Sequence, residues 1–259
     1  MFSTNLLLDK IGFILQARVG STRFHKKVME LINSEPLIFH VINQARHSKY
    51  AKNIVIATTQ NKEDDVIEEY LKGKSNHIFR GNEKDCLDRY FQCAKLHSFK
   101  IIVRITCDNP LIDPTLIDEA IDIFINNKYD YVTNCKPRTY PQGTEVEIFS
   151  FTALENAWKY SKKHSEREHV TPYFYNNPEK FKIFNIKNDS NLSNLRWTVD
   201  RVEDLDFVKT IYAKLKKSPI LMNDILKLLI DEPNLVKINE KHMIDEGYLQ
   251  SITNEKNKI

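Results

Sequence analysis

The chain has 259 residues, of which 41% are hydrophobic and 28% charged, and its formal net charge is +3. That length suits one large α/β domain, or one domain with a small appendage. It is long enough to bury a sizeable core without disulfides or metals. A charge so close to balance gives no support for a nucleic-acid or membrane-surface binder, and no apolar stretch approaches the ~20 residues that span a bilayer.

The cysteines and the start of the chain bear on its compartment. The four cysteines, Cys86, Cys93, Cys107 and Cys135, contain no C-x-x-C pair, so their spacing does not predict a structural zinc site. The first ten residues hold too short an apolar run for a secretory signal. We therefore expect reduced thiols in a cytoplasmic protein.

Apolar runs of strand length alternate with segments of helical period through the first half of the chain. The predicted strands cover residues 11–17, 53–58, 77–80 and 101–106, and the predicted helices cover residues 36–47, 63–72, 85–98 and 114–126. Such alternation predicts a doubly wound, mostly parallel sheet with helices on both faces. Ligands of these sheets bind beyond the carboxyl ends of the strands, so we expect chemistry at residues 16–23, 58–61, 80–85 and 106–110.

The second half changes character. Residues 129–150 contain Tyr-rich, alternating pieces broken by prolines and a glycine, which indicates an antiparallel excursion from the sheet. We predict further helices at 151–162, 203–216 and 219–231, and a strand at 195–199 that ends in an aspartate. Residues from 237 onward are polar without a clear period. We accordingly expect one domain over residues 1–235, with its excursion at 136–175, and a polar tail over residues 236–259.

A glycine and several cations follow the first predicted strand in the run Q-A-R-V-G-S-T-R-F-H-K-K. Gly20 and Ser21 permit a tight loop whose backbone N–H groups face an anion. Arg18, Arg23 and Lys27 add the bidentate and point-charge contacts that phosphates accept. At the carboxyl end of a buried strand, this pattern favours a triphosphate cradle over a solvated basic loop. The spacing is not that of a Walker A loop.

Two aspartates end predicted strands. Asp108 in R-I-T-C-D-N-P-L-I-D follows a long buried strand, where a carboxylate faces the ligand crevice and can hold Mg²⁺. Asp113, just before Pro114, fits a helix N-cap instead. Asp200 in R-W-T-V-D-R ends the last predicted strand. It either shares a metal with Asp108 or caps the helix that follows.

Polar residues gather in two further places. Arg80 ends a short strand and Asp85 precedes a helix, so this corner either meets a base or ribose or is a plain strand–turn–helix. The irregular middle holds P-R-T-Y-P-Q-G-T-E-V-E and E-R-E-H, whose concentration of polar groups suggests acceptor recognition. We expect acceptor contacts from Arg138, Tyr140, Gln142, Glu145, Glu147, Arg167, His169 and Arg196.

Long motifs occur along the chain in an order that resembles one enzyme family. They are Q-A-R-x-G-S-T-R, A-T-x-x-N-x-x-D-D, F-R-G, R-I-T-x-D-x-P-L-I-D-P, P-R-T-Y-P-x-G, E-R-E-H-V-T-P-Y and R-W-T-V-D. The chain resembles the cytidylyltransferases that include the CMP-KDO and CMP-sialic acid synthetases, and most of all the spore coat polysaccharide biosynthesis branch. Several long motifs in order are far more specific than any single one.

The resemblance implies a Rossmann-like fold and the transfer of CMP from CTP to a small anionic acceptor, such as an acidic sugar, with release of pyrophosphate. It also implies Mg²⁺ held by Asp108 and Asp200. In the family pattern, Arg18, Ser21, Arg23 and Lys27 match the residues that take the triphosphate. The expected catalytic set is therefore Arg18, Arg23, Lys27 and Asp108. The expected nucleotide contacts are Gln16, Ala17, Arg18, Gly20, Ser21, Arg23, Lys27, Thr58, Arg80, Asp85, Arg104 and Thr106.

A homodimer is also implied, in which the excursion of one subunit helps to build its partner's site. Tyr140, Tyr173, Phe174 and Tyr175 favour the dimer, because so much aromatic surface needs a cover. A helix of the same chain is the alternative cover.

The chain departs from the family pattern at two places. Phe24, His25 and Lys26 stand where the family usually has Leu-Pro-x before its lysine, although Lys27 is kept. Cys107 precedes the proposed metal aspartate, where glycine is common. Both departures concern fine specificity, since neither removes a proposed catalytic group.

The residues alone leave other functions open. A nucleotidyltransferase for another base or for a non-sugar acceptor, such as a phosphonate or polyol phosphate, is the nearest alternative. A nucleotide-sugar glycosyltransferase would need a D-x-D metal motif at the edge of the sheet, and no predicted strand ends in one. A non-catalytic nucleotide-binding protein is disfavoured because every charged group of the proposed site is retained. Fold alone does not choose among these.

Overall fold

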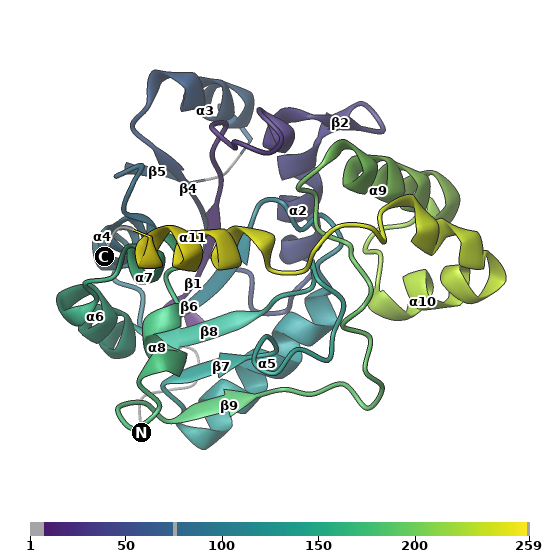
Figure 1. Cartoon of the computed structure of the whole chain (residues 1–259). Helices are drawn as coiled ribbons and strands as arrows, with labels where there is room; N and C mark the ends of the chain where they lie inside the picture. The colour runs from purple at the N-terminus through teal and green to yellow at the C-terminus, as the bar shows by residue number, and fades with distance from the viewer. Residues whose placement is uncertain (1–7, 75–76, 258–259) are drawn as a thin grey trace.

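The computed structural model describes residues 8–74 and 77–257, and a seven-stranded sheet lies at its centre (Figure 1). The strand order is β5-β4-β1-β6-β8-β7-β9. These strands are β1 (Ile11–Gln16), β4 (Ile54–Thr59), β5 (His77–Gly81), β6 (Ile101–Thr106), β7 (Tyr131–Thr133), β8 (Glu147–Ser150) and β9 (Ile183–Asn185). A separate antiparallel ribbon pairs β2 (Leu31–Ile32) with β3 (Glu35–Pro36).

The four strands predicted in the first half form the parallel part of the sheet. β1 lies between β4 and β6, and β5 continues the sheet beyond β4, all in parallel register. The chain therefore winds outward in one direction through β4 and β5, then returns to place β6 on the other side of β1. This reversal makes the carboxyl ends of β1 and β6 the topological switch point, where such sheets bind ligands.

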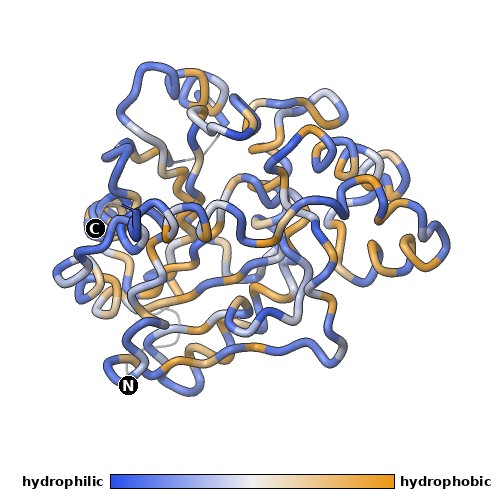
Figure 2. The backbone as a smooth tube through the Cα atoms, viewed as in Figure 1, coloured by the Kyte–Doolittle hydropathy of each residue, from blue (hydrophilic) through white to orange (hydrophobic). Residues whose placement is uncertain are grey.

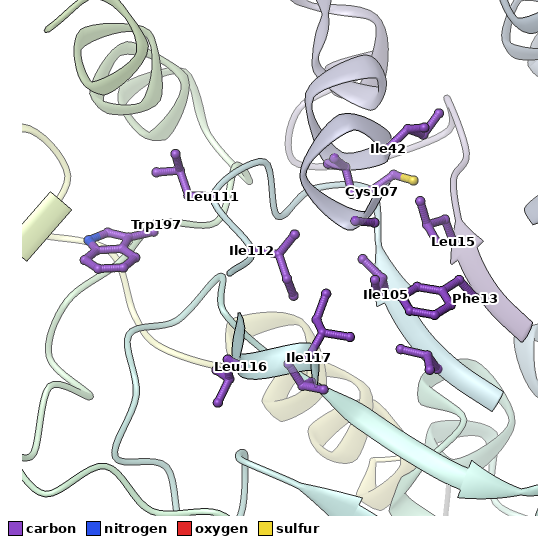
Figure 3. Packing of buried hydrophobic residues seen from close by; sticks show 14 of the residues in the cluster. Phe13, Leu15, Ile42, Ile105, Cys107, Leu111, Ile112, Leu116, Ile117 and Trp197 are labelled. Carbon is purple, nitrogen blue, oxygen red and sulfur yellow. The ribbon is translucent and has the colours of Figure 1, made fainter. Parts of the chain in front are cut away.

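The sheet has a hydrophobic core on each face, as doubly wound strands require. In β1, Phe13 and Leu15 face one core and Ile14 faces the other, because successive side chains of a strand point to opposite faces. Figure 3 shows Phe13 and Leu15 beside Ile105 of β6 and Ile42 of the covering helix. Figure 2 shows the resulting pattern, with hydrophobic segments gathered in the central strands and hydrophilic ones in the outer loops.

Ten α-helices of the described residues surround the sheet. The first core is covered by α2 (Leu37–Arg46), α3 (Asp65–Leu71), α5 (Pro114–Asn127), α9 (Val202–Leu215) and α10 (Met222–Asp231). The second is covered by α4 (Cys86–Leu96), α6 (Phe151–Tyr160) and α8 (Pro172–Asn176), with α7 (His164–His169) and α11 (Glu246–Lys256) nearby. No helix within the described residues is long and apolar enough to cross a membrane.

Local chemistry fixes several helix starts. The Asp113 side chain accepts a hydrogen bond from the Thr115 N–H and begins α5, as predicted. Asp85 caps α4 in the same way, accepting from the Asp88 N–H. Short 3₁₀ turns occur at η1 (Lys27–Met29), η2 (Lys62–Asp64) and η3 (Pro233–Ile238).

The predicted antiparallel excursion extends the sheet. β8 pairs antiparallel with both β6 and β7, and β7 pairs parallel with the edge strand β9. The expectation of a mostly parallel α/β fold with an antiparallel addition is therefore confirmed.

Three local expectations in the second half need correction. The strand predicted at 195–199 is an extended segment outside the sheet, because its backbone bonds to loops: Trp197 N–H donates to Gln142 O and Val199 N–H to Asp108 O. A Cβ on Gly143, whose φ is +104°, would lie 2.4 Å from the Thr198 nitrogen, so only glycine fits this approach. The E-R-E-H run lies in helix α7, and the tail predicted to lack a period contains helix α11.

The aromatic residues that favoured a dimer have another cover. Tyr140, Tyr173 and Phe174 are buried within the chain, and Phe174 lies between Tyr131, Phe149 and the ring of Phe181. The alternative considered from the sequence, cover by the same chain, is correct for these residues. The homodimer stays a prediction that now rests on the family resemblance alone.

Candidate active site

A cavity of about 690 Å³ opens at the switch point of the sheet. The carboxyl ends of β1 and β6 form its floor, which is where the topology predicts a ligand. Its volume falls in the usual range for small-molecule sites. The residues that line it from these strand ends are Gln16, Ala17, Arg18, Ser21, Thr22, Arg23, Lys27, Arg104, Thr106, Cys107, Asp108 and Asn109.

The basic loop after β1 wraps the floor of the cavity. The Val19 carbonyl accepts hydrogen bonds from the N–H groups of Ser21 and Lys26, which closes a tight turn. Lys26 then adopts a left-handed conformation, with φ of +59°, and the η1 turn begins at Lys27. This path directs Arg18, Arg23 and Lys27 into one cavity, as the sequence predicted from their positions.

Lys27 joins the two strand-end aspartates. Its Nζ lies 2.8 Å from Asp108 Oδ2 and 2.6 Å from Asp200 Oδ1, and it also donates to the Val199 carbonyl at 2.9 Å. Burial alone would lower the pKa of Lys27, but the two carboxylates outweigh it and raise that pKa above its ordinary value. Asp108 and Asp200 therefore meet around one permanently charged ammonium group.

Asp200 is the most strongly held carboxylate of this cluster. Arg23 Nη2 donates to its Oδ1 at 2.8 Å, beside Lys27. Burial would raise the pKa of Asp200, but Lys27 and Arg23 hold it well below its usual range. Behind it, buried Arg196 pairs with Asp204 at 2.8 Å and reaches Asp200 Oδ2 at 3.4 Å. Arg196 thus supports the cluster from outside the cavity.

Three cations that line the cavity lack a carboxylate partner among the described residues: Arg18, Lys84 and Arg89. Arg89, on α4, is only 3% exposed, and its guanidinium donates to the Asn82 carbonyl and, at 3.2 Å, to Cys86 Sγ. A buried cation without a counter-charge costs free energy, and an anionic ligand removes that cost. The sequence reasoning missed Lys84 and Arg89.

A signal for Arg89 was present. It stands three residues after Cys86 and four before Cys93, so it lies on the buried face of α4. A cation on such a face favours a ligand of opposite charge, although Asp85, four residues earlier, is an alternative partner.

The opposite end of the cavity contains cations that are paired within the chain. Arg138 pairs with Glu145, and buried Arg104 pairs with Glu147. The Tyr131 hydroxyl donates to Glu147 at 2.5 Å. Burial alone would lower the pKa of Arg104, but Glu147 outweighs it and raises that pKa. Gln142 also lines this end, so four of the predicted acceptor residues meet there.

His169 is a fifth predicted acceptor residue in the cavity wall. Its Nε2 lies 3.0 Å from Ser251 Oγ, and its ring meets that of Tyr248 edge-on. Burial lowers the pKa of His169 to about 4, although Glu168 opposes the shift. The ring is therefore neutral at pH 7 and a weak proton acceptor there.

Helix α11 and the residue before it line one wall of the cavity. Figure 1 shows this helix lying in front of the sheet. Asp245 Oδ1 accepts from Arg138 Nη2 at 2.9 Å, and its Oδ2 lies 3.4 Å from Lys136 Nζ. Glu246 pairs with Arg201 at 2.7 Å. The segment predicted as a polar tail thus supplies much of the wall, a contribution that the sequence reasoning missed.

Seven predicted site residues do not line the cavity: Gly20, Thr58, Arg80, Asp85, Tyr140, Arg167 and Arg196. Arg80 donates to the carbonyls of Thr59 and Asn61 and pairs with acidic residues of α3. Asp85 caps α4 and pairs with Arg167 at 2.9 Å. Direct contact of these side chains with a ligand in the cavity has no support from their positions.

A basic loop, unpaired cations and two aspartates at the switch point of a doubly wound sheet define a protein class: α/β enzymes that act on a phosphorylated nucleotide. Residues 12–246 match the family model described as cytidylyltransferase. The chain belongs to the cytidylyltransferase family and is a CTP-dependent nucleotidyltransferase.

The chain is also similar to individual proteins. The chain is 37% identical over 236 residues to the uncharacterized protein MJ1063 of Methanocaldococcus jannaschii, covering 89% of this chain and 94% of that protein. It is 29% identical over 240 residues to the spore coat polysaccharide biosynthesis protein SpsF of Bacillus subtilis, covering 88% and 97%. A solved cytidylyltransferase from Leptospira borgpetersenii superposes with a TM-score of 0.85 at 32% identity, covering 91% of this chain and 98% of that chain.

Proposed function

We propose that this protein transfers CMP from CTP to a small anionic acceptor, such as an acidic sugar, and releases pyrophosphate, for surface polysaccharide or glycan biosynthesis. The observation that carries the proposal is the cluster of Lys27, Asp108 and Asp200 beside the basic loop at the switch point. The likeness to SpsF, whose name refers to spore coat polysaccharide biosynthesis, supports the part of the proposal that concerns polysaccharide biosynthesis.

The unpaired cations suit the triphosphate. Arg18 and Arg89 each present a guanidinium to the cavity without a carboxylate partner among the described residues, and Lys84 adds an exposed ammonium group. Attack on the α-phosphorus leaves pyrophosphate, whose negative charge grows as the bond breaks. Fixed cations beside the leaving group stabilise that charge, and positioning with electrostatics dominates this kind of reaction. These residues therefore account for nucleotide binding and for stabilisation of the departing pyrophosphate.

The aspartates fit Mg²⁺ by the chemistry of their donors. Mg²⁺ takes one or two carboxylates together with substrate phosphates and waters. Asp108 Oδ1 accepts no hydrogen bond from the residues that the structure describes, so it is available to a cation. Within residues 8–74 and 77–257, no three His, Cys, Asp or Glu side chains gather around one point. Asp108 and Asp200 would hold Mg²⁺, which would supply charge neutralisation at the α-phosphate.

The acceptor is proposed to bind at the other end of the cavity. Arg138 and Gln142 line the same cavity with neutral His169, on segments of the chain other than the basic loop. An anionic acceptor that binds Arg138 replaces the carboxylate of Asp245, which holds that guanidinium in this structure. The acceptor hydroxyl and the α-phosphate then approach each other between the two ends of one cavity, which is the arrangement that an in-line displacement needs.

A pyrophosphate-release assay tests the proposal. The purified chain is incubated with Mg²⁺, one of the four nucleoside triphosphates, and a panel of acidic sugars, phosphonates and polyol phosphates. We expect turnover with CTP and an acidic sugar. Equal or better use of UTP contradicts the cytidylyl assignment, and turnover only with a phosphonate or polyol phosphate contradicts the acceptor class.

We also propose the homodimer that the family resemblance implies. Light scattering at micromolar protein should give twice the 30.5 kDa mass of the chain. A monomer with full activity would show that each site is complete within one chain.

A further inference from the structure

The buried carboxylate of Asp64 forms a hydrogen bond with the backbone of the basic loop. Asp64 is 1% exposed and does not line the cavity. Its Oδ1 accepts the Val19 N–H at 2.6 Å, across 45 residues of sequence, and its Oδ2 accepts the Thr59 hydroxyl. Hydrogen bonds to an ionised acceptor are among the stronger ones in proteins, and burial strengthens them further.

Val19, which donates its N–H to Asp64, also makes the backbone hydrogen bonds that close the basic loop. Its carbonyl accepts the N–H groups of both Ser21, at 2.7 Å, and Lys26, at 3.0 Å. The peptide groups on either side of this residue therefore fix where Arg18 leaves the strand and where η1 starts at Lys27. A shift of Val19 moves Arg18, Ser21 and Lys27 together.

Asp64 is itself held in place by Arg80. The Arg80 Nε donates to Thr59 O at 2.8 Å and its Nη2 to Asn61 O at 2.7 Å, which spans the turn between β4 and α3. Its Nη1 pairs with Asp65 and Glu68 at the start of α3. Arg80 thus clamps the turn that carries Asp64, which gives this arginine of the F-R-G motif a place outside the cavity.

We propose that Asp64 is a positioning residue, which sets the basic loop for triphosphate binding through the Val19 N–H, with Arg80 as the clamp behind it. The part played by the triphosphate rests on the proposed function. The loop geometry does not, since it is a contact between two segments of the chain.

A matched pair of alanine variants separates positioning from stability. Asp64→Ala removes the hydrogen bond between Asp64 and the Val19 N–H. As a control, Asp113→Ala removes another buried aspartate, which accepts the N–H groups of Thr115 and Met222 away from the cavity. Hydrogen–deuterium exchange of peptides within residues 16–28 reports the loop directly. Calorimetric titration with CTP and Mg²⁺ reports its ligand, and thermal melting reports overall stability.

We expect Asp64→Ala to raise loop exchange about tenfold, as loss of one strong hydrogen bond allows. The CTP dissociation constant should rise about 10- to 100-fold, because displaced binding groups lose most of their contribution. Asp113→Ala should lower the melting temperature while loop exchange and CTP affinity stay at wild-type values. Asp64→Asn keeps an oxygen for the Val19 N–H and should restore CTP affinity to within a few-fold of wild type.

Several results would overturn the proposal that Asp64 positions the basic loop. They are unchanged loop exchange or CTP affinity in Asp64→Ala, an equal loosening of the loop in Asp113→Ala, and no rescue by Asp64→Asn. If Asp64→Ala does not fold, Arg80→Met loosens the same turn, and unchanged loop exchange in that variant overturns the idea. A wild-type protein that binds no CTP contradicts the proposed function instead, and loop exchange still decides the contact between Asp64 and Val19.

Discussion

The two ends of the cavity balance their charges in different ways. At the nucleotide end, Arg18 and Arg89 face the cavity without carboxylate partners among the described residues. At the acceptor end, Arg138 is paired with both Glu145 and Asp245. Arg18 and Arg89 are thus ready for an anion, although Arg23 and Lys27 beside them are paired with aspartates. An anion that binds Arg138 must displace a carboxylate of the same chain. The difference predicts that the nucleotide binds tightly and fast. It also predicts that the acceptor binds more weakly, because carboxylates of the chain compete with it for Arg138.

The origin of the two ends explains this contrast. The nucleotide end is built from the ends of the adjacent parallel strands β1 and β6 and from the start of α4, so much of its geometry follows from the sheet. The acceptor end is assembled from the loop at 135–147, helix α7 and the segment at 245–255. Such segments are held by contacts that are distant in sequence. Their local unfolding therefore costs less free energy than local unfolding of the central strands.

Loss of Asp108 should produce the largest effect, because it disables the nucleotide end without altering the acceptor end. Asp108→Asn removes one charge from the pair around Lys27 and one candidate Mg²⁺ ligand. We expect kcat/KM for CTP to fall about 100- to 1,000-fold, the range seen when one transition-state contact is lost. The measurement is the initial rate of pyrophosphate release at limiting Mg²⁺.

Asp118→Asn is the control for this change. Asp118 accepts from the Ser48 hydroxyl at 2.5 Å, outside the cavity, so its variant should keep wild-type rates. A fully active Asp108→Asn enzyme would contradict the metal and charge roles of this residue.

Arg89 offers a second way to break the nucleotide end, with an unusual signature. Arg89→Met removes a buried, uncompensated cation, so we expect the melting temperature to stay constant or rise. The CTP dissociation constant should rise about tenfold or more, since one charge-assisted contact is lost. Lys95→Met, an exposed change on the same helix, should alter neither quantity. A lower melting temperature with unchanged CTP affinity would make Arg89 a structural residue.

Most of the fold follows from the sequence for a physical reason. The parallel strands β1, β4 and β6 are mostly buried on both faces, so each contains a long apolar run, whereas the edge strand β5 is only partly buried. Capping aspartates mark the starts of α4 and α5. The segment at 195–199 alternates apolar and polar residues like a strand, although all five side chains are buried. Its backbone partners, however, are loops near residues 108 and 142, and no local pattern reveals such pairing.

The site could be predicted where it follows strand ends and could not where it depends on side-chain direction. Arg80 and Arg89 flank the same turn, yet only Arg89 faces the cavity. The side chain of Arg80 turns instead to the carbonyls after β4 and to α3. Helix α11 escaped prediction because its inward face is polar: Tyr248, Ser251 and Glu255 meet a charged cavity wall, which hydropathy does not detect.

Release of the acceptor end should have a moderate effect in the opposite direction. Asp245→Ala frees Arg138 and Lys136 from the carboxylate that competes with the acceptor. We expect the acceptor KM to fall about 2- to 5-fold, as removal of a partly exposed ion pair of up to ~1 kcal/mol allows. CTP affinity should not change. The measurement is acceptor KM at saturating CTP.

Asp231→Ala provides a surface control for the charge change alone, since this residue lies at the end of α10 and outside the cavity. A rise in acceptor KM in Asp245→Ala would mean that Asp245 helps to form the acceptor site rather than competing with the acceptor for Arg138.

The smallest expected effect is a pH dependence confined to the acceptor end. Burial lowers the pKa of His169 to about 4, against about 6.5 for a free histidine. Between these values the unfolded chain binds a proton that the folded protein does not, so this contribution to stability is complete above pH 6.5 and declines as the pH falls toward 4. At pH 5.5 the loss should be about 1 kcal/mol, or a fall of about 2–4 °C in the melting temperature.

His169→Gln should remove that part of the decline, whereas His164→Gln, at an exposed position of the same helix, should keep it. Melting curves of the three proteins between pH 7.5 and 5.5 decide the matter, and parallel curves would show that His169 takes up its proton without cost in the folded wall.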